Sequence, residues 1–230
     1  MTPQEKTIVA LDCENPDRAK KIIEELDTLV HWYKMGPVLF TRHGVEIIRF
    51  LHEKRKRIFV DLKLHDTPNV TAETVTQLAE MGVEYATVHL TGGRKMLDSA
   101  AAACRGSKLK LIGVSLLTSS LASDYKTLGF SGTDTELVVR LKDLALEARL
   151  SGMLCSPQEL TDLRKSVPND FTLVTAGIRI PGQEVYQDDQ LRTASASEAI
   201  QKGADYLIVG RPITLSGEPR LRVQELYSKI

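Results

Sequence analysis

Residues 59–69 read FVDLKLHDTPN, an apolar strand that becomes charged at its end and leads through Thr67, Pro68 and Asn69 into a helix. This is one strand followed by one helix, and the same unit recurs on both sides along the chain. Apolar and β-branched runs predict eight strands, over residues 7–11, 32–35, 58–62, 85–89, 109–116, 152–155, 171–175 and 206–209. Eight such units predict an α/β fold, a (β/α)8 TIM barrel.

The segments between these strands carry helix signals. Asn15 and Ser156 each precede a proline, a pair of residues that typically starts a helix. Ser195 and Glu198 have the spacing of a capping box before another helix. Because no linker or low-complexity segment interrupts the alternation, we expect residues 1–230 to form a single barrel domain.

Composition limits the partners of this domain. The 30 basic and 30 acidic residues cancel, so no overall field attracts nucleic acid or an anionic membrane, and an anion site must be local. The N-terminal residues lack a signal-peptide pattern, and no apolar run approaches the roughly 20 residues that span a bilayer. Three cysteines without CxxC spacing suit a reducing compartment. We expect a soluble, cytoplasmic protein.

Charged residues gather at the end of the third predicted strand. Asp61 and Lys63 are two residues apart, so they lie on one face of the strand, which points into the barrel near its mouth. Lys34, near the end of the second strand, should be their neighbour, and Asp66 follows just after the third. Alternating charges would keep these two lysines and two aspartates ionised. The simpler alternative is a solvated run of surface ion pairs.

Glycine and arginine at the last strands favour an anion site. Residues 208–214 read IVGRPIT, in which Gly210 allows close approach and Arg211 offers donors that suit phosphate. Residues 176–179, AGIR, place Arg179 at the same mouth, where barrels often bind phosphate. Two long connections, 118–133 and 177–193, leave this end, either as lids or as tolerated surface insertions.

These segments, taken in order, resemble the bacterial type of orotidine 5′-phosphate decarboxylase. The matching motifs are VALD, YKMG, DLKLHDTPN, SLLTS, AGIR, DDQLR and VGRPIT, which together span nearly the whole chain. The resemblance implies a carboxy-lyase that converts orotidine 5′-monophosphate to uridine 5′-monophosphate and CO2 without a cofactor or metal. That reaction is the last step of de novo pyrimidine (UMP) biosynthesis. Two departures from the family pattern, Met35 and Ala176, remove no functional group.

The resemblance also implies roles for individual residues. In the catalytic cluster, Lys63 would donate the proton that replaces CO2, Asp61 would face the substrate carboxylate, and Asp12 and Lys34 would contact the ribose. Asp66 and Thr67 would complete the site of a neighbouring subunit, which implies a homodimer. The remaining implied contacts are Thr118 with the pyrimidine, and Arg179, Gln190, Gly210 and Arg211 with the phosphate. Gln183 competes with Gln190 for this role.

Two other functions fit parts of the pattern. A sugar-phosphate decarboxylase or aldolase of the same superfamily shares the Asp-x-Lys-x-x-Asp strand but uses magnesium, and it typically has an acidic residue where this chain has Lys34. A non-catalytic phosphate-ligand sensor would keep Gly210 and Arg211 but need no charge cluster. Among the histidines, we expect His89 to be a hydrogen-bonded support and assign no role to His65.

Overall fold

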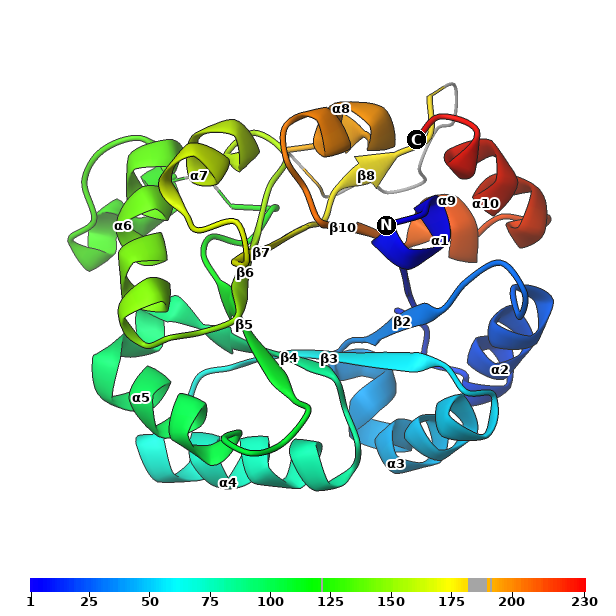
Figure 1. Ribbon diagram of the computed structural model, residues 1–230, viewed down its shortest axis with the longest axis horizontal. Coiled ribbons are helices and arrows are strands. Elements are labelled where there is room, and N and C mark those ends of the chain that lie inside the picture. The colour runs from blue at the N-terminus through cyan, green and yellow to red at the C-terminus, as the bar shows by residue number, and fades with distance from the viewer. Residues whose placement is uncertain (121, 182–189, 191) are drawn as a thin grey trace.

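The computed structural model describes residues 1–120, 122–181, 190 and 192–230, and its centre is a closed barrel of parallel strands (Figure 1). Neighbouring strands follow chain order around the barrel, and the last strand pairs with the first. All eight predicted strands are confirmed, with small shifts at some ends. They are β1 (Thr7–Ala10), β2 (Trp32–Met35), β3 (Arg57–Leu64), β4 (Tyr85–His89), β5 (Lys110–Val114), β6 (Gly152–Cys155), β7 (Thr172–Thr175) and β10 (Tyr206–Val209).

Helices form an outer ring around the strands (Figure 1). Their bounds are α1 (Pro3–Lys6), α2 (Pro16–Glu25), α3 (Pro37–Glu53), α4 (Pro68–Glu80), α5 (Gly93–Ala103), α6 (Asp134–Glu147), α7 (Leu160–Ser166), α8 (Ala196–Gln201), α9 (Arg211–Thr214) and α10 (Pro219–Tyr227). Two 3₁₀ helices, η1 (Leu90–Gly92) and η2 (Ala122–Leu128), lie in connections. No described helix is long and apolar enough to cross a bilayer.

Two of the three predicted helix starts are confirmed. The Asn15 side chain accepts a hydrogen bond from the Asp17 amide at 2.8 Å, and Ser195 forms the predicted capping box. The start predicted at Ser156 is wrong, because α7 begins only at Leu160. Residues 157–159 form a turn instead, closed by the Glu159 carboxylate, which accepts a hydrogen bond from the Ser156 amide at 2.7 Å.

Aromatic side chains fill the amino-terminal half of the barrel. Trp32 stacks on Tyr85 with ring centroids 4.9 Å apart, and Tyr206 packs edge-on against both. Each of these three residues begins its strand, so the bulk lies at the strands' amino ends. Smaller inward residues, among them Ala10, Val114 and Ile208, continue the inner layer. Open volume is therefore left at the carboxyl ends of the strands.

Both predicted long connections leave the carboxyl ends of strands. The connection after β5 contains η2, and the one after β7 is bracketed by the short parallel strands β8 (Ile178–Arg179) and β9 (Ala194–Ser195). Pairing of Ile178 with Ala194 brings the two ends of the second connection together. The described parts of both connections therefore lie beside the open end of the barrel.

Candidate active site

A cavity of about 640 Å³ opens at the carboxyl ends of the strands. This volume falls within the roughly 300–1,000 Å³ of typical small-molecule sites. Predicted site residues from both halves of the chain line it: Asp12, Lys34, Asp61, Lys63, Thr118, Arg179, Gln190, Gly210 and Arg211. The structure thus brings together in one cavity nine predicted residues that are distant in sequence.

The charged residues form a continuous chain on one wall. Lys34 Nζ lies 2.9 Å from Asp12 Oδ1 and 3.3 Å from Asp61 Oδ2. The same Asp61 oxygen lies 2.9 Å from Lys63 Nζ. Only 8% of the Lys34 side chain and 4% of the Asp61 side chain are exposed, so these are not solvated surface ion pairs. The predicted alternation is confirmed for Lys34, Asp61 and Lys63.

The place of the second aspartate differs from the expectation. Within one chain, Asp12 and not Asp66 completes the alternation. Asp66 and Thr67 are exposed, do not line the cavity, and are linked to each other by a 2.6 Å hydrogen bond from the Thr67 amide to Asp66 Oδ1. The physical reason is that β3 has ended, so the chain carries Asp66 away from the barrel interior before α4 begins.

A backbone irregularity aims the Lys63 side chain. The pairing of β3 with β4 shifts register between Val60 and Leu64, and Lys63 has a left-handed backbone with φ of 50°. Such a conformation costs a non-glycine residue about 1–3 kcal/mol and is concentrated at functional sites. Asp61 and Lys63 share a face as predicted, but a bulge, not plain alternation along the strand, puts them there.

Thr87 fixes this bulge, and sequence reasoning missed it. Its hydroxyl donates to Asp61 Oδ1 at 2.9 Å and accepts from the Lys63 amide at 2.8 Å. One buried side chain thereby orients both the carboxylate and the lysine. The available signal was its place on the fourth predicted strand, two residues from Tyr85 and two from His89, which puts Thr87 on their face.

Electrostatics keep the core of the cluster charged. Burial would raise the pKa of Asp61, but the ammonium groups of Lys34 and Lys63 outweigh it and hold that pKa below its ordinary value. Burial would likewise lower the pKa of Lys34, and the carboxylates of Asp61 and Asp12 outweigh it and raise that pKa. Asp61 is therefore an anion and Lys34 a cation at neutral pH.

The carboxyl ends of β7 and β10 carry the groups suited to an anion. Gly210 precedes the short helix α9 and Arg211 begins it, and both line the cavity. Arg179 extends from β8, where its Nη1 donates to the carbonyl of Ile178 at 3.0 Å. The Thr118 hydroxyl donates to the side-chain oxygen of Gln190, joining the connections after β5 and β7. Gln190 therefore lies in the cavity, whereas Gln183 lies outside the described residues.

His89 lies near Lys63 and makes a local hydrogen bond. Its Nδ1 is 2.6 Å from the Thr91 hydroxyl, and its ring stacks on His65 with centroids 5.6 Å apart. Burial, with His65 and Lys63 nearby, lowers the pKa of His89 to about 4. The ring is therefore neutral at pH 7, and the hydrogen bond expected of His89 is present.

Metal ligation finds little support in the described part of the chain. No group of three or more His, Cys, Asp or Glu residues within it is arranged to hold an ion. The Lys34 ammonium lies between Asp12 and Asp61, where a cation bridging those carboxylates would have to bind.

Fold and site together define a barrel enzyme in which a lysine–carboxylate cluster and two arginines line one cavity. The chain belongs to the orotidine 5′-phosphate decarboxylase / HUMPS family, whose sequence model matches residues 5–226. Orotidine 5′-phosphate decarboxylase from Coxiella burnetii is 41% identical over 231 residues, covering 99% of this chain and 97% of that protein. The enzyme of that name from Saccharophagus degradans is 36% identical over 230 residues, 99% of this chain and 96% of that protein.

Solved structures agree with the sequence comparison. The crystal structure of orotidine 5′-phosphate decarboxylase from Lactobacillus acidophilus superimposes with a TM-score of 0.84 at 31% identity, covering 98% of both chains. Family membership, predicted from the ordered motifs, and the barrel fold, predicted from the eight strand–helix units, are both confirmed.

The charge cluster predicts a measurable change in the variant Lys34→Met. The pKa of Asp61 should rise, because burial continues to disfavour the anion while one of its two ammonium neighbours is gone. In the wild type, the depressed pKa contributes stability above the ordinary aspartate range, and this is lost as pH falls through the folded value. Carbon-13 NMR of the Asp61 carboxyl during an acid titration measures the shift.

The control for this titration is Lys54→Met, which removes a surface ion pair with Glu24. It should leave the Asp61 titration unchanged. An unchanged Asp61 pKa in Lys34→Met as well would contradict the coupling between the two side chains.

Proposed function

We propose that Lys63 donates the proton that replaces the departing carboxyl group when this enzyme converts orotidine 5′-monophosphate to uridine 5′-monophosphate. As a member of its family, the chain decarboxylates that nucleotide, and this reaction is the last step of de novo pyrimidine biosynthesis. The observation that carries the proposal is the Lys63 ammonium at the cavity wall, 2.9 Å from a buried carboxylate.

The reaction breaks the bond between the pyrimidine ring and its carboxyl group, and CO2 leaves. The electron pair stays on a ring carbon that delocalises it poorly, so a nearby positive charge must stabilise it. The Lys63 ammonium supplies that charge and then a proton, which forms the new C–H bond. The neutral amine regains a proton from solvent, and no electrons are gained or lost.

Binding roles divide between the two walls. Asp12 and Lys34 contact the ribose, Asp61 faces the substrate carboxylate, and Thr118 contacts the pyrimidine. Arg179, Gln190, Gly210 and Arg211 hold the phosphate. This division is supported by the cavity lining, which combines charged groups on or just after β1, β2 and β3 with donors from the connections after β7 and β10. Gripping a phosphate that does not react lets remote binding energy position the base over Lys63.

A cofactor-free mechanism follows from the place of Lys34. A magnesium-dependent sugar-phosphate enzyme needs carboxylates open to the ion, and here an ammonium lies between Asp12 and Asp61. This side chain therefore discriminates between the two kinds of enzyme. A phosphate sensor would leave the buried charge cluster without a role.

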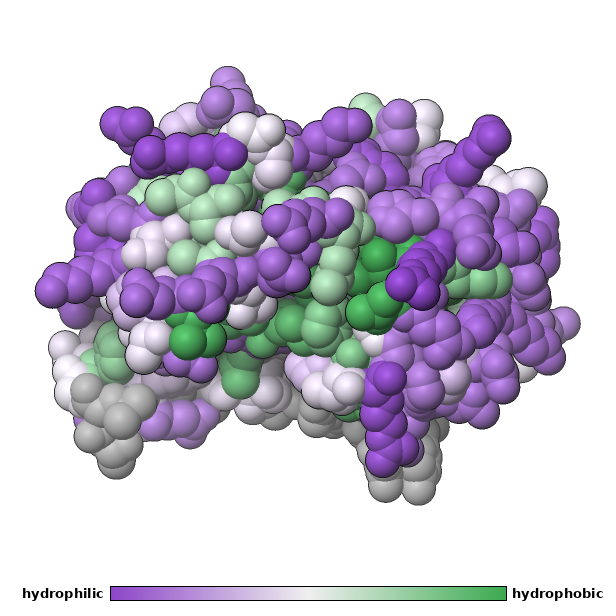
Figure 2. Space-filling model, turned by 90° about the horizontal axis from the view of Figure 1, so that it is seen from below, coloured by the Kyte–Doolittle hydropathy of each residue, from purple (hydrophilic) through white to green (hydrophobic). Residues whose placement is uncertain are grey.

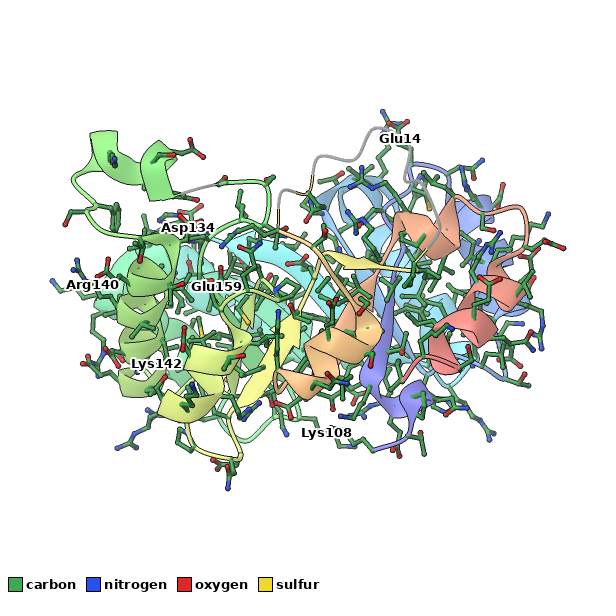
Figure 3. The ribbon with its side chains drawn as sticks, turned by 90° about the horizontal axis from the view of Figure 1, so that it is seen from above. Glu14, Lys108, Asp134, Arg140, Lys142 and Glu159 are labelled. Atoms are coloured by element: carbon green, nitrogen blue, oxygen red, sulfur yellow. The ribbon has the colours of Figure 1, made fainter. Side chains whose placement is uncertain are left out.

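The first test is the variant Lys63→Ala, assayed by the ultraviolet absorbance change on conversion of the substrate with EDTA present. Loss of a general acid typically costs about 10²- to 10⁴-fold, so turnover should fall at least that far while affinity for uridine 5′-monophosphate changes little. The wild type should remain active in EDTA. Lys108→Ala, at the opposite end of the barrel (Figure 3), is the control. Strict magnesium dependence would favour the sugar-phosphate alternative.

The phosphate wall is tested by Arg211→Ala. This change should lower kcat/KM for orotidine 5′-monophosphate by more than about tenfold although the phosphate does not react, because charge-assisted hydrogen bonds that drive positioning are lost. Steady-state kinetics measure the loss, with the exposed Arg105→Ala as the matched variant. A loss below about tenfold would contradict the assignment of Arg211.

A homodimer completes the proposal, with Asp66 and Thr67 reaching the partner's cavity. Both residues are exposed at the start of α4. Three valines on the neighbouring helices are also unusually exposed: Val38 (51%), Val45 (48%) and Val70 (46%). Figure 2 looks onto the α3–α5 side and shows apolar side chains grouped among polar ones. Such grouping favours a protein interface.

Mixing two inactive variants tests this arrangement. In a mixed dimer of Lys63→Ala and Asp66→Ala chains, one site has both substitutions and the other has neither. Random exchange of subunits should therefore restore about a quarter of wild-type activity. If Asp66 serves its own chain, the mixture will be no more active than its components.

We also propose that residues 1–230 act as one catalytic domain in the cytoplasm. Pairing of the last barrel strand with the first supports the single unit, and the cysteines are free thiols, as suits a reducing compartment.

A further inference from the structure

We propose that Arg192 is a positioning residue that sets the connection after β5 against the connection after β7, so that Thr118 and Gln190 meet over the cavity. This inference rests on the proposed function, in which Thr118 contacts the base and Gln190 the phosphate. Arg192 does not line the cavity and acts through its neighbours.

The Arg192 guanidinium contacts elements from three parts of the barrel. Its Nη1 donates to the carboxylate of Glu159, in the turn after β6. Its Nη2 donates at 2.9 Å to the carbonyl of Leu117, after β5. Asp134 Oδ2, at the start of α6, lies 3.9 Å from Nη1. Arg192 itself belongs to the connection after β7, so one side chain links three successive strand-to-helix connections.

These contacts lie directly next to the predicted ligand groups in sequence. Leu117 precedes Thr118, and Gln190 is two residues before Arg192. On its other side, Arg192 is followed closely by β9, which pairs with β8 and so leads to Arg179. A shift of Arg192 would therefore move both partners of the Thr118–Gln190 hydrogen bond.

Glu159 provides a rigid anchor for the guanidinium. Its side chain is 2% exposed, as is that of Arg192, and its carboxylate also accepts the Ser156 amide at 2.7 Å. Figure 3 shows Glu159 near Asp134, on the side of the barrel where α6 and α7 lie. Burial raises the pKa of Glu159, and Arg192 opposes that rise. The pair is thus held in a dry interior.

The energetics of such pairs favour positioning over stability. A buried ion pair often stabilises a fold no better than apolar side chains of similar size, because desolvation cancels the attraction. Its advantage is direction, since a guanidinium fork fixes both Glu159 and the Leu117 carbonyl at defined angles. Replacing both charges by apolar groups should therefore separate the two roles.

The chain offers a matched control. Arg164 Nη2 pairs with Asp205 Oδ2 at 2.6 Å and also donates to the carbonyl of Gly203. This pair ties α7 to the segment before β10, and none of these three residues lines the cavity. Removing Arg164 measures how much stability is lost with any arginine that hydrogen-bonds to both a carboxylate and the backbone.

The experiment compares the double variant Arg192→Met/Glu159→Met with Arg164→Met and the wild type. Thermal unfolding measures stability, and calorimetry measures the affinities for uridine 5′-monophosphate and uridine. Steady-state kinetics measure kcat/KM. We expect the double variant to unfold close to the wild-type midpoint. Its preference for the nucleotide over the nucleoside and its kcat/KM should each fall by about ten- to a hundredfold, because misplaced positioning groups cost about that much.

Each outcome has a distinct meaning. Arg164→Met should lose stability and keep the nucleotide preference within about twofold. If the double variant is folded and keeps both the nucleotide preference and kcat/KM, the positioning role is overturned. If the double variant does not fold, Arg192→Lys is the deciding variant, because it keeps a cation for Glu159 but lacks the planar guanidinium. Its nucleotide preference should fall. An unchanged preference would overturn the positioning role. A wild type that neither converts the substrate nor prefers the nucleotide would instead refute the proposed function.

Discussion

The Asp61 carboxylate, buried and shared between two ammonium groups, is the interaction on which the site depends. A charge in this position would be costly without partners, and Lys34 and Lys63 supply them within 3.3 Å and 2.9 Å. Thr87 occupies the other carboxylate oxygen and also holds the Lys63 backbone in its left-handed conformation. The same hydroxyl thus orients the carboxylate and holds the strained backbone of Lys63 in place.

Barrel geometry places this charge cluster in a cavity that both halves of the chain line. Aromatic rings of Trp32, Tyr85 and Tyr206 fill the amino-terminal half, so the cavity lies where all strands end. Strands from the first half of the chain carry Lys34, Asp61 and Lys63, and connections from the second half carry Arg179 and Arg211. Closure of β10 onto β1 brings the two halves together around one cavity.

Connections that leave adjacent strands need contacts that hold them in place relative to one another. The barrel fixes the residue at which each connection begins, but not the position of the residues that follow. The buried pair of Arg192 and Glu159, with the Leu117 carbonyl, joins the connections after β5, β6 and β7. Apolar packing at this position would serve stability equally well. The presence of a polar network is therefore explained by the site and not by the stability of the fold.

The alternation of apolar runs and helix signals was enough to predict the strands and the barrel, because those patterns are local and repeat along the chain. Ordered motifs were likewise enough to identify the family and to nominate the residues that line the cavity. Tertiary structure alone decided the bulge at Lys63, the role of Thr87, and the turn that delays α7. The bulge depends on Thr87, which is 24 residues from Lys63. The Glu159 carboxylate, which closes the turn before α7, is also held by Arg192, 33 residues away. Contacts of that range leave no periodic signal in the sequence, since only the folded chain brings the partners together.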